Sequence, residues 1–174
     1  NKILFFIYIK DMIIKLKNKQ TLQLDDFSFK CSIGKNGTTS HKIEGDKKTP
    51  KGKFSIGHIY YRKDKIKSFE TKLKKIKIKK NMGWCDDINS SKYNQSIKVN
   101  KKIHHEKLFR VDRKYDLLIP IKYNFNKPKR NKGSCIFLHL TKSYKPTDGC
   151  IAINKNDFFI ILKLINRNSK IIIN

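Results

Sequence analysis

The chain has 174 residues, of which 38% are hydrophobic and 11% aromatic, enough to build one core and too many for a disordered chain. Its 41 Lys and Arg residues outnumber 14 Asp and Glu residues, so the formal net charge is +27. We therefore expect a single domain with a strongly cationic surface.

Two interpretations of this charge are open. An anionic partner, such as nucleic acid, an acidic membrane surface or an acidic wall polymer, would explain it. Codon composition would explain it as well, because Lys, Ile and Asn are abundant along the whole chain and share A/T-rich codons. We favour the second, since no zinc finger, RNA-recognition signature or basic heptad pattern accompanies the lysines. The sequence therefore predicts no nucleic-acid partner.

The chain begins with an apolar run at residues 3–9, which is too short to span a membrane. Lys10 and Asp11 follow it directly, and no small-residue cleavage site is visible. We interpret residues 1–11 as an N-terminal extension or the remnant of a signal peptide, and expect the domain to occupy residues 12–174. No stable membrane span is predicted.

Alternating apolar and polar residues predict a β-meander at the start of the domain. The runs at residues 13–17, 21–24 and 27–31 alternate and are separated by short polar turns. Residues 34–52 are rich in glycine and are expected to form a loop. Residues 54–61 are expected to form one strand.

The second half is also expected to be mostly β. Strands are predicted at residues 76–79, 115–119, 134–140 and 171–173. The first carries lysines suited to a sheet edge, and the third is apolar enough for the centre of a sheet. One convincing helix begins near residue 154, with Asn156 or Asp157 as its expected cap.

The segment HLTKSYKPTDGCIAI, residues 139–153, holds the strongest candidates for chemistry. A nearby imidazole such as His139 can take the proton of a thiol such as Cys150 and make it a nucleophile. Gly149 permits a tight turn whose N–H groups face a developing oxyanion. On spacing alone, an ordinary strand-end histidine and a buried cysteine remain the better explanation.

The order of these residues resembles a known signature. His139, a loop and Thr147-Asp148-Gly149-Cys150 resemble the signature of the L,D-transpeptidase (YkuD-type) catalytic domain, which is a His, a loop and then Ser/Thr-His-Gly-Cys. Residues 49–54 look like the TPxGxF element of that family, and residues 31–37 resemble the strand and glycine loop before it. Further blocks are similar to a short proteobacterial branch, at residues 83–87, 93–94, 105–106, 115–117 and 133–139.

Two positions depart from the family pattern. Asp148 stands where many members have His, and Ala152 stands where the commoner pattern has Arg. The resemblance therefore does not settle which donor and acceptor this chain prefers.

The resemblance implies a mainly β fold, a mixed β-sandwich or barrel with one C-terminal helix. It implies that Cys150 attacks a stem-peptide amide of peptidoglycan and that His139 moves the proton, with a backbone carbonyl orienting the ring. The N–H groups of Gly149 and Cys150 would face the oxyanion. An amine on a neighbouring stem would resolve the thioester. No cofactor or metal, a monomer, and action in the periplasmic cell envelope are implied.

Six residues are candidates for contact with substrate: Trp84, Asp86, Asp87, Tyr93, Thr147 and Asp148. Asp86 and Asp87 would hold an amine of diaminopimelate or would bond to the local backbone of a turn, and both interpretations stay open. Cys150 is the expected reactive thiol, because Cys31 and Cys135 lie in predicted strands and Cys85 adjoins two carboxylates.

Two alternative functions remain. The first is a peptidoglycan L,D-carboxypeptidase or amidase that uses the same cysteine and histidine. The second is a basic nucleic-acid-binding domain, which would bind tightly, lose its ligand with salt and show no thiol reactivity.

Overall fold

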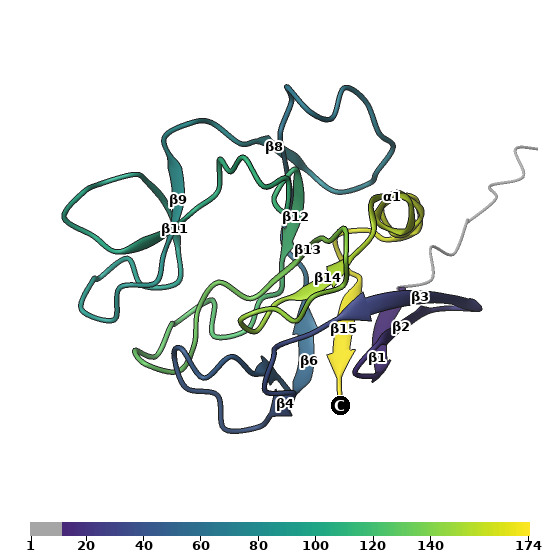
Figure 1. The fold of residues 1–174 in the computed structure, drawn as a ribbon, viewed down its shortest axis with the longest axis horizontal. Helices are drawn as coiled ribbons and strands as arrows, with labels where there is room; N and C mark the ends of the chain where they lie inside the picture. Colours follow the sequence, from purple (N-terminus) through teal and green to yellow (C-terminus); the bar gives the residue numbers. More distant parts are fainter. Residues whose placement is uncertain (1–11) are drawn as a thin grey trace, which may run out of the picture.

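In the computed structural model, which describes residues 12–174, ten strands form one large sheet (Figure 1). Their order across the sheet is β6 (Gly52–Ser55), β15 (Lys170–Ile173), β1 (Ile13–Asn18), β2 (Thr21–Leu24), β3 (Phe27–Ser32), β14 (Ile151–Ile153), β13 (Phe137–Leu140), β12 (Leu117–Pro120), β7 (Ile59–Tyr61) and β8 (Lys75–Lys77). The mainly β fold with one helix is confirmed.

The predicted meander is present, because β1, β2 and β3 pair antiparallel in that order. The closing strand β15 lies parallel to β1 on its other side. The lysine-bearing strand β8 lies at an edge of the sheet, and β13 lies inside it between β12 and β14. The predicted meander, the predicted edge strand with lysines and the predicted central strand are thus all present.

The predicted strand at residues 54–61 is two strands in the structure. β6 pairs with β15, whereas β7 pairs with β12 near the opposite edge. The chain breaks at Gly57, where a Cβ would lie 3.2 Å from Pro120, and Ile56 forms an isolated bridge with Ile121. The sheet therefore curls into a half-barrel that brings its two edges toward each other (Figure 1).

Two smaller sheets were not predicted. β4 (Thr38–Thr39) and β5 (Thr49–Pro50) pair within the glycine-rich segment. β10 (Ser96–Lys98), β9 (Met82–Cys85) and β11 (His105–Lys107) form a three-stranded sheet. These strands have two to four residues, which is too short for alternation to distinguish a strand from a loop.

The helix α1 spans Lys155–Leu164, and its cap is Asn154 rather than Asn156 or Asp157. The Asn154 side chain accepts a hydrogen bond from the Asp157 N–H at 2.9 Å. Asn154 has an extended backbone with ψ 165°, as a residue at the N-cap requires. Among the described residues, no helix is long and apolar enough to cross a membrane.

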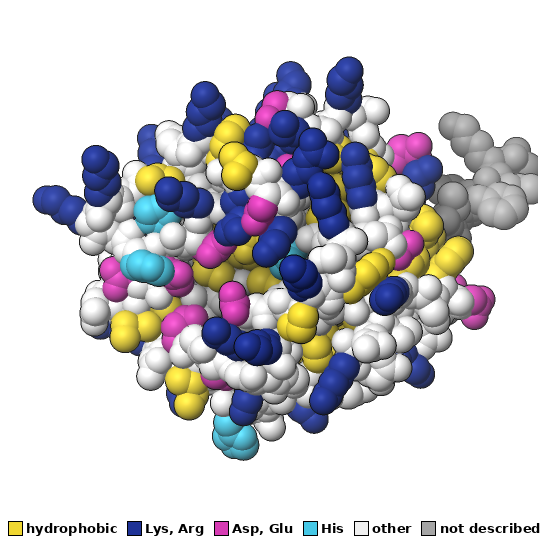
Figure 2. Space-filling view, in the orientation of Figure 1, with side chains coloured by type: hydrophobic (Ala, Val, Ile, Leu, Met, Phe, Trp, Pro, Cys, Tyr) yellow, Lys and Arg dark blue, Asp and Glu magenta, His cyan; other side chains and the backbone are white. Residues whose placement is uncertain are grey.

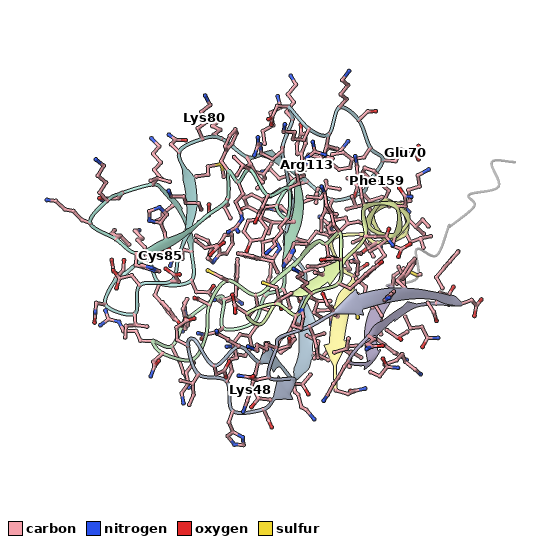
Figure 3. All side chains as sticks on the ribbon, viewed as in Figure 1. Lys48, Glu70, Lys80, Cys85, Arg113 and Phe159 are labelled. Carbon is pink, nitrogen blue, oxygen red and sulfur yellow. The ribbon has the colours of Figure 1, made fainter. Side chains whose placement is uncertain are left out.

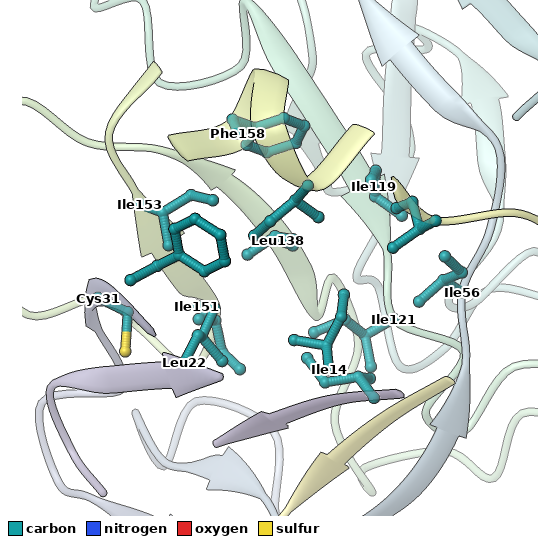
Figure 4. Close-up of a cluster of buried hydrophobic side chains, with 14 of the residues drawn as sticks. Ile14, Leu22, Cys31, Ile56, Ile119, Ile121, Leu138, Ile151, Ile153 and Phe158 are labelled. Carbon is teal, nitrogen blue, oxygen red and sulfur yellow. The ribbon is translucent and has the colours of Figure 1, made fainter. Parts of the chain in front are cut away.

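Strand β13 is buried on both faces, because it separates two hydrophobic clusters. Leu138 faces the main core with Phe158 of α1 and with Ile151 (Figure 4). Phe137 faces a second cluster together with Trp84 of the three-stranded sheet.

The prediction that residues 1–11 are an N-terminal extension or the remnant of a signal peptide concerns residues outside the described part of the chain.

Candidate active site

Adjacent parallel strands place Cys150 and His139 on one face of the sheet. His139 of β13 is in register with Ala152 of β14. Successive side chains of a strand point to opposite faces, so Cys150, two residues before Ala152, points the same way as His139. All three line one cavity, while Ile151 points into the main core. The sheet therefore brings together two residues that are eleven positions apart.

The Cys150 thiol has two backbone partners. It donates to the carbonyl of Cys135 at 3.1 Å and accepts from the N–H of Phe137 at 3.4 Å. Cys135 has a left-handed backbone, with φ 53°. This turn explains why β13 begins at Phe137 and not at residue 134 as predicted. No hydrogen bond joins Cys150 to His139 in the described part of the chain.

The His139 ring is held by its backbone neighbour and by an aromatic side chain. Its Nδ1 lies 2.9 Å from the Leu140 carbonyl oxygen, so Nδ1 carries a proton and Nε2 has a free lone pair. A backbone carbonyl thus orients the ring, as expected. The Tyr115 ring packs edge-on against the imidazole at 5.3 Å.

Burial keeps both groups neutral at rest. Burial raises the pKa of the Cys150 thiol to about 12, although the Phe137 N–H opposes the shift. Burial lowers the pKa of His139 to about 4. A thiolate–imidazolium pair is therefore not the resting state, and the thiol proton must move as the sulfur attacks.

The segment before Cys150 is anchored on both sides. Thr147 forms a bridge with Gly34, and its hydroxyl donates to the Cys150 carbonyl at 2.6 Å and accepts from the Gly149 N–H at 3.2 Å. Gly149 has φ 135°, and a Cβ there would lie 2.9 Å from the Lys48 carbonyl. The Gly149 N–H is thus occupied by Thr147, in contrast to its expected place facing an oxyanion.

The cavity beside Cys150 has a volume of about 780 Å³ and contains charged residues of both signs. Its carboxylates are Glu44, Asp64, Asp86, Glu106, Asp112, Asp116 and Asp148. Its Lys and Arg residues are Lys65, Arg110, Arg113, Lys114, Lys142, Lys145 and Lys155.

Three of the six expected substrate residues line this cavity, namely Asp86, Thr147 and Asp148. Asp86 pairs with the exposed His104 ring, whose Nδ1 lies 2.6 Å from the carboxylate. This contact raises the pKa of His104. Asp87 does not line the cavity, and it accepts from the Asn89 N–H at 2.9 Å. Asp87 therefore fits the local turn interpretation.

Trp84 and Tyr93 were expected to line the cavity, but they do not. They are 2% and 3% exposed and form part of its supporting wall. The Trp84 indole donates to Asn94 at 2.9 Å, and the Tyr93 hydroxyl donates to Glu44. The same Asn94 oxygen accepts from the Cys135 N–H at 3.2 Å. This chain of contacts holds the backbone N–H of Cys135, whose carbonyl accepts from the Cys150 thiol.

Among the lining residues that were not assigned to the site from sequence are Glu106, Arg110 and Tyr115. The Arg110 guanidinium binds Glu106 and lies over the Tyr115 ring at 5.0 Å. The blocks that contain Glu106 and Tyr115 were visible in the resemblance, but no local pattern indicated that they meet at Cys150.

No group of three or more His, Cys, Asp and Glu side chains within residues 12–174 is arranged to hold a metal ion. The cysteines in this region are all free thiols. Cys31 is buried, and burial raises its pKa to about 12. Cys135 contributes to the cavity lining, but burial raises the pKa of its thiol well above the usual value, so this thiol is protonated, in line with Cys150 as the expected reactive one.

The sequence matches the family model of the L,D-transpeptidase catalytic domain, YkuD, over residues 9–173. The chain belongs to this family. A comparison of the sequence with curated proteins found no significant match for this L,D-transpeptidase domain.

The fold of this L,D-transpeptidase domain is similar to Bd1075 of Bdellovibrio bacteriovorus, with a TM-score of 0.52 and 14% identity over 94% of this chain. An L,D-transpeptidase from Mycobacterium smegmatis gives a TM-score of 0.41 with 10% identity. L,D-transpeptidase 1 of Mycobacterium tuberculosis gives 0.40 with 10% identity. The chain spans 47%, 58% and 61% of these three proteins, respectively.

Proposed function

We propose that this chain is a peptidoglycan L,D-transpeptidase in which Cys150 is the nucleophile and His139 the base. The observation that carries the proposal is the convergence of two buried side chains, 9% and 5% exposed, in one cavity. Family membership supports peptidoglycan as the substrate and the cell wall as the place of action. We propose that the chain acts as a monomer without a cofactor.

In the first half-reaction, the Cys150 thiol rotates from the Cys135 carbonyl toward Nε2 of His139. The imidazole takes the thiol proton as sulfur bonds to the carbonyl carbon of the donor stem peptide. The Phe137 N–H, which already contacts the sulfur, stabilises the developing thiolate. The Cys150 N–H is the proposed oxyanion donor. The carbon–nitrogen bond then breaks, and imidazolium protonates the leaving amine.

In the second half-reaction, an amine of a neighbouring stem attacks the thioester. A carbon–nitrogen bond forms, the carbon–sulfur bond breaks, and His139 passes the proton of the amine to the thiolate. Water in place of the amine gives carboxypeptidase activity at the same residues. Asp86 and Thr147 are proposed to contact the stem peptides, whereas Trp84 and Tyr93 support the wall behind them.

The test is mass spectrometry of muropeptides after incubation with the purified chain. We expect crosslinked stems, and none with Cys150→Ala, because that variant lacks the sulfur. His139→Ala should lower product formation by about 10²- to 10⁴-fold, as loss of a general base does.

Cys31→Ala is the matched control, since Cys31 is also buried but lies in the main core. It should keep crosslinking activity. Crosslinks made by Cys150→Ala would contradict the assignment of the nucleophile. Cleaved stems without crosslinks would identify a carboxypeptidase or amidase. Salt-sensitive nucleic-acid binding with no muropeptide product would favour the alternative of a basic nucleic-acid-binding domain.

A further inference from the structure

The cavity differs in charge from the rest of the protein. Seven of the 14 Asp and Glu residues line it, together with seven of the 41 Lys and Arg residues. The lining thus has no net formal charge, although the chain carries +27. Figure 2 shows acidic side chains interspersed with Lys and Arg around the hollow in the middle of this face. The cavity therefore repels a cation far less than the surrounding surface does.

Most of these carboxylates already have partners. Asp64 binds Arg62, while Glu106 and Asp112 bind Arg110. Asp86 pairs with His104. Asp148 is exposed to the cavity and forms no hydrogen bond or ion pair with any residue from 12 to 174. It is a free carboxylate next to the nucleophile.

Asp148 also differs from the other charged residues that act on the Cys150 thiol, because those residues are paired. Glu106 and Asp148 raise the pKa of the Cys150 thiol, and Lys42 lowers it. Glu106 is neutralised by Arg110, and Lys42 is neutralised by Asp46. Asp148 is thus the uncompensated charge in this group of three.

Asp148 is not needed to hold the turn before Cys150. The adjacent Thr147 hydroxyl accepts from the Gly149 N–H and donates to the Cys150 carbonyl. The backbone N–H of Thr147 donates to the Ile33 carbonyl at 2.9 Å. The position of Asp148 at the cavity is therefore set by its neighbours, which leaves its carboxylate available to a ligand.

We propose that Asp148 binds the ammonium group of the acceptor and directs that amine to the Cys150 thioester. This inference rests on the proposed function. The ammonium first loses one proton to solvent, the neutral amine then attacks the carbonyl carbon, and carbon–sulfur cleavage follows. The second amine proton reaches Cys150 through His139. Asp148 is a specificity residue, because it acts on the charge of the acceptor.

The test compares two acceptors that attack the same acyl-enzyme. At pH 7, glycine amide is mainly a cation, whereas hydroxylamine is mostly uncharged. A stem tetrapeptide forms the acyl-enzyme, and mass spectrometry measures the amide and the hydroxamate products. In Asp148→Asn, the ratio of amide to hydroxamate should fall about fivefold, which is typical for loss of one partly exposed ion pair. Asp148→Glu should retain the ratio.

Glu70→Gln is the matched control. It makes the same change in net charge, but Glu70 lies beside α1 near Phe159 (Figure 3), where it pairs with Lys163. It should leave the ratio unchanged. An unchanged ratio in Asp148→Asn, with the acyl-enzyme still formed, would overturn this inference and leave the proposed function standing. Failure of the unaltered chain to form an acyl-enzyme on Cys150 would overturn both.

Discussion

At the residue scale, the resting chemistry of the site follows from burial. Cys150 and His139 lie among apolar and aromatic side chains, and each is shifted toward its uncharged form. Desolvation penalises a charge, so it raises the pKa of a thiol and lowers that of an imidazole. At rest, the Cys150 thiol donates a hydrogen bond to the Cys135 carbonyl. Attack therefore requires a substrate whose carbonyl is in place when the proton moves.

The pH dependence of thiol alkylation tests this conclusion. Because the pKa of Cys150 is raised to about 12, the thiolate fraction should rise about tenfold for each pH unit below that value. Labelling of Cys150 by iodoacetamide should accelerate from pH 7 to pH 10 without a plateau, as followed by peptide mass spectrometry. A plateau below pH 8 would instead indicate a preformed thiolate–imidazolium pair.

At the element scale, the loop between β13 and β14 is tied to the start of α1. Asn154 accepts from the Asp157 N–H, and its Nδ2 donates to the Tyr144 hydroxyl at 2.9 Å. Tyr144 belongs to the loop that carries Asp148. One side chain therefore caps the helix and fastens the segment that leads to the nucleophile.

Replacement of this cap should affect both elements. Asn154→Ala should lower the free energy of unfolding by about 1 kcal/mol, as the loss of an N-cap does, with a melting temperature about 3 °C lower. Acylation of Cys150 should also slow, because the loop loses its Tyr144 contact. Thermal unfolding and acylation kinetics measure the two effects.

Asn156→Ala is the control for this prediction, because Asn156 is an exposed residue in the first turn of α1. Its side chain makes no hydrogen bond with the part of the chain that the structure describes. It should change the melting temperature by less than Asn154→Ala does. Equal losses in the two variants would rule out the capping role.

At the scale of the whole molecule, the first and the last described strands, β1 and β15, pair with each other. Lys170 donates its N–H to the Met12 carbonyl at 3.1 Å, and Ile14 pairs with Ile171 in the core. Each of these two isoleucines is at most 1% exposed. The contacts support our proposal that the domain occupies residues 12–174.

A chain that starts at Met12 tests this boundary. We expect its melting temperature to lie within about 2 °C of that of the full chain, since β1, β15 and the core that they share are retained and changes outside a core have small effects on stability, and we expect Cys150 to be acylated at the same rate. The matched comparison is a chain that starts at Lys15 and so lacks Ile14. That chain should unfold at a much lower temperature. A large loss on removal of residues 1–11 alone would contradict the boundary.

Much of the fold could be predicted because the signals are local. Alternation in residues 13–31 depends on neighbouring side chains, and it correctly indicated β1, β2 and β3. The order of His139, Thr147, Gly149 and Cys150 likewise indicated the family. The short strands β9, β10 and β11 could not be predicted, because they are stabilised by pairing across the chain and not by their own pattern.

What the sequence by itself determined is therefore the family, the mainly β fold and the identity of the candidate nucleophile and base. Tertiary structure alone decided that Asn94 holds the Cys135 N–H, that Trp84 and Tyr93 are buried, and that Asp148 has no hydrogen-bond or ion-pair partner among residues 12–174. Periodicity and turn chemistry belong to adjacent residues. Burial, protonation and charge pairing depend on which distant residues the curled sheet brings together, because they arise from the local dielectric and from neighbouring charges.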